Sequence, residues 1–112
     1  MRAIILAVFF GLSLAGCGQS EAEKIKSQAD MKEIKLQRLA LEFLEPTLKD
    51  AKSAEYRNRK GLCGEVNSKN SMGGYTGFQR FIAAGKGMVA LEKDSGLSAS
   101  DFNQLWGTAC SS

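Results

Sequence analysis

The sequence predicts an α+β domain, in which a long N-terminal helix and a short C-terminal helix accompany a small antiparallel sheet of three or four strands. Residues 19–52 contain no glycine and are rich in helix-forming side chains. Residues 53–93 instead combine glycine, β-branched and aromatic residues in stretches of period two. Residues 98–110 return to the helical spacing of apolar side chains.

The N-terminal helix has a broad apolar face, which we expect to pack on the sheet. Its members are Ile34, Leu36, Leu39, Ala40, Leu41, Phe43, Leu44, Leu48 and Ala51. Residues before Lys32 include few apolar side chains, so we expect a tether or frayed helix over 17–32 and the folded domain over 33–112. Pro46 disfavours helical geometry at Glu45, so the helix is expected either to kink there or to restart.

The sheet is expected to be a meander, because the connections between strands are too short for parallel crossovers. Strands are predicted over 54–59, 61–67, 75–83 and 88–92, with a loop over 67–74 and a turn over 85–87. In the longest strand, alternation places Tyr75, Gly77, Gln79, Phe81 and Ala83 on one face, and Thr76, Phe78, Arg80 and Ile82 on the other.

The C-terminal helix has a clear start. Ser98 can cap it, Asp101 completes an approximate capping box, and Leu97 is placed to contact Phe102. Its expected apolar face consists of Phe102, Leu105, Trp106 and Ala109. We expect this helix to dock on the sheet through Trp106.

The first 16 residues have the features of an exported leader. Arg2 precedes an uncharged apolar run from Ala3 to Leu14, which is shorter than the roughly 20 residues that cross a bilayer. An uncleaved anchor and an ordinary signal peptide cleaved elsewhere are the alternatives.

The tetrapeptide that follows is Leu14-Ala15-Gly16-Cys17, which resembles the lipobox of bacterial lipoproteins. The resemblance implies cleavage before Cys17 and acylation of that residue, with palmitate or similar chains. Several acyl chains together would anchor the protein to a membrane facing the periplasm. Position 18 is Gly, not the Asp that resembles an inner-membrane retention signal, so we expect the outer membrane.

The remaining charge and cysteines restrict the possible functions. Removing the leader takes away Arg2 and leaves 14 basic and 12 acidic residues, a balance too mild to indicate nucleic-acid binding. Arg57, Arg59 and Lys60 form a tight basic group, which we expect to be a solvated turn and not an anion site. The chain contains no histidine and no cysteine pair at ligand spacing, so we expect neither a metal nor a cofactor.

If Cys17 is acylated, Cys63 and Cys110 remain, and an oxidising periplasm favours a disulfide between them. On the chain-entropy model, closing the long loop between these two cysteines adds about 4 kcal/mol to the free energy of unfolding. Such a disulfide would attach the C-terminal helix to the second strand. The alternative is two separately buried thiols.

The second half has a distinctive run of residues. Ser53-Ala54-Glu55-Tyr56-Arg57-Asn58 is followed by Cys63-Gly64-Glu65-Val66-Asn67-Ser68-Lys69-Asn70-Ser71-Met72-Gly73-Gly74-Tyr75. This segment is similar to a group of small, uncharacterised bacterial and phage proteins with the pattern Cys-Gly-Glu-Val-Asn-x-Lys-Asn-x-x-Gly-Gly-Tyr. The group often has Asp-Pro before Ser-Ala, whereas this chain has Ala51-Lys52 there. The resemblance implies no particular reaction.

Enzymatic activity is not expected. Without histidine, a serine or cysteine nucleophile lacks its usual base. Glu65 has no neighbouring carboxylate with which to form an acid–base pair. The glycines between positions 73 and 77 are not a phosphate loop, because Phe78-Gln79 follow them in place of lysine and a hydroxyl residue.

A polar loop is the candidate contact surface for a protein or glycan partner. Its residues are Glu65, Asn67, Lys69, Asn70 and Ser71, followed by Tyr75, Phe78 and Arg80. The alternative is that Asn67 and Asn70 only satisfy backbone groups in a tight turn.

We therefore expect a non-enzymatic interaction module of the cell envelope. The first alternative is a prophage or conjugative-element lipoprotein that excludes superinfection or entry. The second is an enzyme centred on Glu65.

Overall fold

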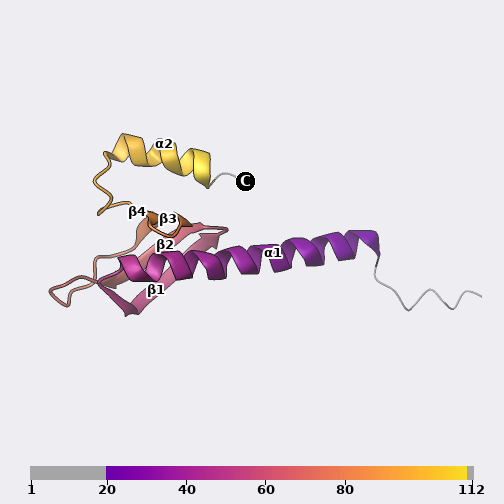
Figure 1. Ribbon diagram of the computed structural model, residues 1–112, viewed down its shortest axis with the longest axis horizontal. Coiled ribbons are helices and arrows are strands. Elements are labelled where there is room, and N and C mark those ends of the chain that lie inside the picture. The colour runs from indigo at the N-terminus through magenta and orange to yellow at the C-terminus, as the bar shows by residue number, and fades with distance from the viewer. Residues whose placement is uncertain (1–19, 111–112) are drawn as a thin grey trace, which may run out of the picture.

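The computed structural model describes residues 20–110, so the predicted leader and Cys17 lie outside the described residues. The predicted α+β class is confirmed, and the four antiparallel strands neighbour one another in chain order (Figure 1). The elements are α1 (Glu21–Leu44), the 3-10 helix η2 (Glu45–Thr47), β1 (Asp50–Lys60), β2 (Cys63–Lys69), β3 (Gln79–Gly85), β4 (Met88–Leu91) and α2 (Ala99–Ala109).

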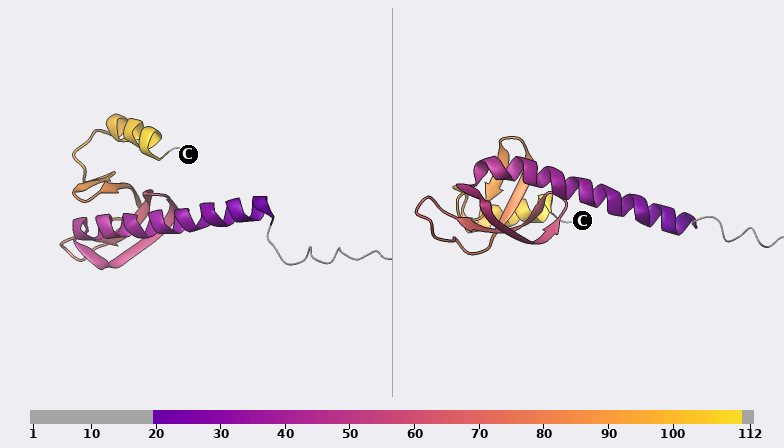
Figure 2. Two further views of the ribbon diagram at one scale, coloured as in Figure 1. Left: turned by 45° about the vertical axis from the view of Figure 1, so that its right-hand side comes forward. Right: turned by 90° about the horizontal axis from the view of Figure 1, so that it is seen from below.

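The sheet lies between the two helices, with α1 on one face and α2 on the other (Figures 1 and 2). Side chains of β3 alternate between these faces, as predicted from Gln79 onward. The larger cluster, on the α1 side, consists of Ala40, Leu44, Val66, Phe81, Ala83 and Leu91. The smaller cluster, on the α2 side, consists of Cys63, Ile82 and Phe102.

Helix α1 ends earlier than the sequence predicts. Ser20 caps its start by accepting a hydrogen bond from the Glu23 backbone N–H at 3.1 Å. The helix ends at Leu44, and Pro46 falls in the short η2 helix that follows. Residues from Asp50 onward are strand, so the predicted helix up to position 52 is wrong there. Pro46 lacks a backbone N–H and therefore interrupts the helical ladder.

The apolar face of α1 is narrower than expected. Ile34 is 51% exposed and Leu39 is 38% exposed, while Ala40 and Leu44 are buried. All residues from 21 to 32 are exposed, because α1 extends well beyond the sheet (Figure 1). Within residues 20–110, no helix combines the length and the apolar composition needed to cross a bilayer.

The strand bounds differ from the predicted ones. β1 begins at Asp50 and has a register irregularity before Glu55, while β2 covers 63–69 and not 61–67. β3 begins only at Gln79, and Tyr75 makes no more than an isolated bridge with Lys69. Gly77 has φ of +82°, a left-handed conformation that interrupts the predicted strand.

Helix α2 is held by its cap, one buried ring and a disulfide. Ser98 accepts a hydrogen bond from the Asp101 backbone N–H at 3.1 Å, as predicted. Phe102 is fully buried and Trp106 is half-buried, but the predicted face is wrong for Leu105 and Ala109, which are exposed. Only the Phe102–Trp106 side meets Ile82 and Ala90 of the sheet. The predicted Cys63–Cys110 disulfide is present and closes a separation of 47 residues.

Candidate functional site

The loop over residues 70–78 joins β2 to β3 at one end of the sheet. One side chain shapes its tip, because Asn70 Oδ1 accepts hydrogen bonds from the backbone N–H groups of Met72 at 2.9 Å and Gly74 at 3.1 Å. The Asn70 backbone also donates to the Gly74 carbonyl at 2.8 Å. The tip is therefore a tight turn organised around a single amide.

The base of the loop is fixed to its neighbours. Asn67 Oδ1 accepts from the Gly77 backbone N–H at 3.0 Å, and Asn67 Nδ2 donates to Glu55 at 3.2 Å. Lys93 Nζ donates to the Thr76 carbonyl at 2.9 Å. The two asparagines thus satisfy backbone groups of the turn, the role that the sequence analysis gave them as the alternative to partner contact.

The loop nevertheless exposes large side chains. Met72 is 92% exposed and Tyr75 is 52% exposed. Lys69 Nζ lies 5.7 Å from the centre of the Tyr75 ring, so a cation accompanies the aromatic side chain. We call the surface formed by Lys69, Asn70, Ser71, Met72 and Tyr75 the loop surface.

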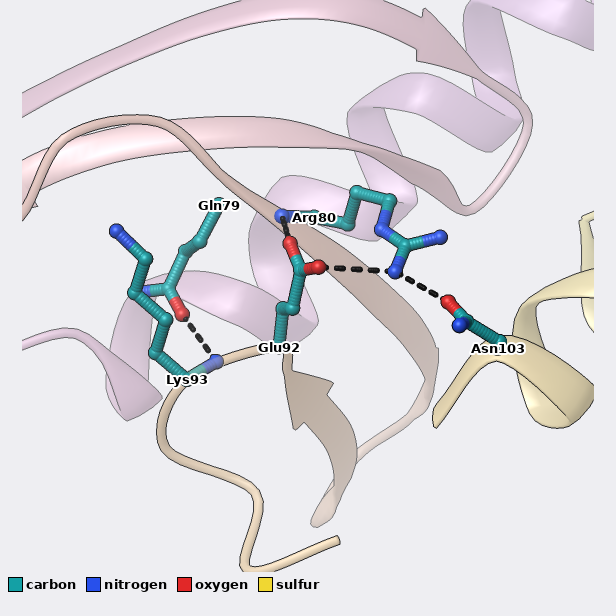
Figure 3. A network of polar contacts seen from close by, with 5 residues as sticks. All are labelled: Gln79, Arg80, Glu92, Lys93 and Asn103. Carbon is teal, nitrogen blue, oxygen red and sulfur yellow. Dashed lines mark hydrogen bonds and ion pairs between the residues drawn. The ribbon is translucent and has the colours of Figure 1, made fainter. Parts of the chain in front are cut away.

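Arg80 is not part of the loop surface. Its side chain instead links Glu92, the residue after β4, to Asn103 of α2 (Figure 3): one guanidinium nitrogen donates to Glu92 at 2.8 Å and to Asn103 at 2.6 Å. The guanidinium also lies 5.0 Å from the Phe102 ring and 5.2 Å from the Trp106 ring. These contacts fix the Arg80 side chain where the sheet meets α2.

Glu65 is separated from the loop surface as well. It pairs with Arg80 in the β2–β3 register and forms an ion pair with Arg57 at 2.5 Å. The Arg57 hydrogen bond holds the pKa of Glu65 below its ordinary value. Arg57 also lies 3.9 Å from the centre of the Phe78 ring.

The basic group is exposed, as predicted, but the predicted turn is wrong, because Arg57, Arg59 and Lys60 lie at the end of β1. Arg57 contacts Glu65 and Phe78 there, and the Arg59 guanidinium lies 5.7 Å from the Tyr56 ring. Within residues 20–110, no cluster of three or more histidine, cysteine or acidic residues could hold a metal ion.

A cleft of about 480 Å³ lies beside the loop surface, and sequence reasoning missed most of it. Its lining residues are Thr47, Leu48, Lys49, Ser68, Lys69, Asn70, Ser71, Thr76, Gln79, Val89, Leu91 and Asp94. Ser68 is 4% exposed and Gln79 is 2% exposed. One signal was available in the sequence: Gln79 is a polar residue on the same strand face as Phe81 and Ala83.

The structure therefore divides the predicted contact surface in two. Asn67, Lys69, Asn70 and Tyr75 come together at the loop, whereas Glu65 and Arg80 lie on the sheet face that α2 covers. Glu65, Asn67 and Lys69 alternate onto the same face of β2, so the division comes from position along the strands: Glu65 and Arg80 are cross-strand partners farther from the loop, and Arg80 is held there by α2.

Comparisons of the whole chain with protein-family models, curated proteins and solved structures find no match. The lipobox resemblance at Cys17 and the resemblance to phage-borne proteins therefore stay predictions. The function must be argued from the geometry of the loop surface and the cleft.

Proposed function

We propose that this protein is a lipid-anchored, non-enzymatic interaction module of a bacterial cell envelope, and that it contacts a partner through the loop surface. One observation carries the proposal. A loop held in one conformation by the Asn70 and Asn67 side chains exposes the apolar Met72 almost completely. A loop already ordered in the free protein loses little conformational entropy on binding.

The exposed side chains have the composition of a contact surface. Methionine and tyrosine are enriched in protein–protein interfaces. Covering a side chain as exposed as Met72 with a partner removes apolar surface from water and so favours association. Lys69 beside Tyr75 adds a positive charge at the border of this apolar group. These features support a protein partner more than a glycan.

The exposed half of α1 supports the anchoring role. Residues 21–32 correspond to about 18 Å of helix and are exposed along their whole length. A segment of this kind would hold the sheet and its loop at a distance from a membrane to which Cys17 is attached.

The geometry at Glu65 argues against a catalytic role. A general acid at neutral pH needs a raised pKa, whereas the hydrogen bond from Arg57 lowers the pKa of Glu65. The described residues around it offer an ion pair and an aromatic ring, which suit a structural position on the sheet.

Anchoring is tested by mass spectrometry and membrane fractionation of the chain produced in a bacterium. We expect the native protein to begin at Cys17, to carry the mass of its acyl chains and to sediment with the outer membrane. The Cys17→Ser variant is expected in the soluble fraction. An intact, unmodified leader on the native protein would overturn the anchoring proposal.

The loop surface is tested by placing a photo-crosslinking amino acid at position 72 in living cells. The matched control is position 86, an exposed residue in the β3–β4 turn at the opposite end of β3. We expect one discrete adduct from position 72 that Tyr75→Ala abolishes, and none from position 86. Equal labelling at both positions, or none at 72, would contradict the proposal.

The same strains can test exclusion of phage or conjugative entry. If the partner belongs to an entry apparatus, expression should reduce plaque or transconjugant numbers, and Tyr75→Ala should restore them. Unchanged numbers would leave a resident envelope protein as the partner.

A further inference from the structure

We propose that the outer face of α1 binds an anionic phospholipid surface, so that the helix lies along the membrane with the sheet on its far side. We call this surface the basic face and define it by Lys24, Met31, Lys32, Ile34, Lys35 and Arg38. The inference goes beyond the proposed function, because an anchor at Cys17 leaves the direction of α1 open. It rests on that anchor only for bringing the helix close to the membrane.

The basic face lies opposite to the side of α1 that packs on the sheet. On the packed side, Glu33 accepts a hydrogen bond from the Gly61 backbone N–H at 2.6 Å, and Ala40 is buried. Lys35 follows Glu33 by two positions and Arg38 precedes Ala40 by two, a rotation of about 200° around an α-helix. Since α2 covers the other face of the sheet, the outer side of α1 is exposed to solvent (Figures 1 and 2).

The charged residues of the basic face all have the same sign. They are the exposed side chains of Lys24, Lys32, Lys35 and Arg38, and within residues 20–110 none of them forms an ion pair. The acidic residues between positions 24 and 38 are Asp30 and Glu33. These two are three positions apart and share the side of α1 that faces the sheet. Glu21 and Glu42 follow only at the two ends of the face, so its centre attracts anions.

Two large apolar side chains lie among these cations. Met31 is 56% exposed and Ile34 is 51% exposed. A shallow hollow of about 320 Å³ on this side of the helix is lined by Ser27, Gln28, Met31, Lys32 and Lys35. Lysine and arginine can extend their charged ends past such apolar neighbours, along their own apolar stems. Met31 and Ile34 can therefore enter the headgroup region while the cations contact phosphates, as in helices that lie in a membrane interface.

The proposed anchor brings the basic face within reach of the headgroups. Cys17 precedes Ser20, the cap of α1, by three residues, which can span no more than about 11 Å. Exposed charges attract one another over roughly the Debye length, about 8 Å at physiological salt. Lys24 lies in the first turn after the cap and so begins close to this range. An acidic protein could also bind cations, but the membrane is the anionic surface that the anchor holds beside α1.

This orientation keeps the sheet away from the membrane. The stretch from Lys24 to Arg38 is about 21 Å of helix, which lies against the headgroups along its length. The sheet packs on the opposite side of α1, so a helix diameter of about 10 Å separates it from the surface. The sheet and its loop surface then face away from the lipid and stay open to a partner.

The experiment reconstitutes the full chain, as purified from a bacterium, in vesicles whose brominated acyl chains quench tryptophan. Met31→Trp places a reporter on the basic face, and Ala29→Trp, at an exposed position on the other side of α1, is the matched control. The native chain, with Trp106, supplies the background. The vesicles contain phosphatidylcholine alone, or phosphatidylcholine and phosphatidylglycerol in a two-to-one ratio. We expect the added fluorescence of Met31→Trp to be lost only with phosphatidylglycerol, and that of Ala29→Trp to persist in both.

Charge variants of Met31→Trp test the role of the cations. One combines Lys24→Gln, Lys35→Gln and Arg38→Gln. Each cation near an anionic surface strengthens association about fivefold, so this variant should weaken the contact about a hundredfold and lose the quenching. The matched control removes three exposed cations outside the basic face, by Lys26→Gln, Lys52→Gln and Lys86→Gln, and should keep the quenching. Raised salt should reduce the quenching at position 31, because it screens the attraction.

Several results would overturn the inference. These are no quenching at position 31, equal quenching at positions 29 and 31, equal quenching with and without phosphatidylglycerol, and equal losses in the two charge variants. A photo-crosslinker at position 31 that labels a protein and no lipid in living cells would assign the basic face to an acidic partner protein instead.

The anchor and the basic face can fail independently. A chain that does not float with vesicles of phosphatidylcholine alone would refute the anchor, and quenching with phosphatidylglycerol vesicles would then decide the inference by itself. A chain that floats with both vesicles but shows no quenching at position 31 would refute the basic face alone.

Discussion

Arg80 shows how a single residue can join several elements. Its guanidinium contacts Glu92 just after β4, and it contacts Asn103, Phe102 and Trp106 of α2. The sequence suggested a surface residue because arginine follows a polar loop. The structure shows a residue whose charge is needed where α2 meets the sheet.

Replacing Glu92, the ion-pair partner of Arg80, should change how the free energy of unfolding depends on pH. Hydrogen bonds from the Arg80 side chain and backbone hold the pKa of Glu92 below its ordinary value of 4.5. A carboxylate with a lowered folded-state pKa stabilises the protein above the unfolded-state value, and this contribution is lost as the pH falls through the folded-state value. Glu92→Gln should therefore lower the free energy of unfolding by about 0.5–1 kcal/mol at pH 7.

Urea unfolding at pH 7, 5 and 3 measures this effect. The difference between the native chain and Glu92→Gln should shrink once the pH falls below about 4.5. Glu42→Gln, at an exposed position of α1, is the control and should differ little from the native chain at any pH. A pH-independent difference for Glu92→Gln would contradict the assigned role.

The Tyr56 hydroxyl is buried without a hydrogen-bond partner in the described part of the chain. Burial raises the pKa of its phenol, since the charged form would be poorly solvated. Removing an unpaired buried hydroxyl removes a desolvation cost, so Tyr56→Phe should be neutral or should stabilise by up to about 1 kcal/mol. The midpoint of urea unfolding measures this change, and Tyr75→Phe, at an exposed position, is the control. A clear loss of stability in Tyr56→Phe would show that the Tyr56 hydroxyl has a hydrogen-bond partner in solution.

At the scale of single elements, two glycines should respond oppositely to alanine. A Cβ at Gly64 of β2 would lie 2.9 Å from Phe81 Cζ and 3.0 Å from Arg59 Cγ. Because Phe81 is fully buried, Gly64→Ala should cost about 1–3 kcal/mol. A Cβ at Gly107 of α2 meets nothing within 4 Å. Gly107→Ala should therefore stabilise by about 0.5–1 kcal/mol through helix propensity.

Thermal unfolding of both variants measures these changes. Each variant serves as the control for the other, since the chemical change is identical and only the surroundings differ. Equal shifts of the unfolding temperature in the same direction for both variants would show that Gly64 is not in close contact with Phe81.

The elements also show which local signals were reliable. Ser98 caps α2 as predicted, because a cap depends on residues three positions apart. The start of β3 was misplaced, because an apolar alternation from Tyr75 is interrupted by the left-handed conformation at Gly77 and by the Asn67 hydrogen bond to it. That hydrogen bond joins residues ten positions apart, which a pattern of period two does not describe.

At the scale of the whole molecule, the two faces of the sheet are covered unequally. Among residues 20–110, the α1 side has a cluster of six buried residues, while the α2 side has three, one of which is Cys63 of the disulfide. The small core on the α2 side makes the covalent link important for keeping α2 in place.

Cys110→Ser should therefore destabilise the protein strongly. A disulfide that closes a 47-residue separation contributes about 4 kcal/mol on the chain-entropy model. Urea unfolding should show this loss, and hydrogen exchange should accelerate in α2 before it does in β2. Dithiothreitol should affect the native chain in the same way and leave the variant unchanged. Equal stability of both chains under oxidising conditions would contradict the prediction.

The sequence by itself predicted the two helices, their order around an antiparallel meander of three or four strands and, on the condition that Cys17 is acylated, the pairing of Cys63 with Cys110. These properties follow from periodicity, from short connections and from the few cysteines present. Only the tertiary structure decided that Arg80 holds α2, that Glu65 leaves the loop surface, and that Lys49, Ser68, Gln79 and Asp94 share one cleft. These facts depend on strand register and helix docking, which bring together residues far apart in the chain and leave no local pattern in the sequence.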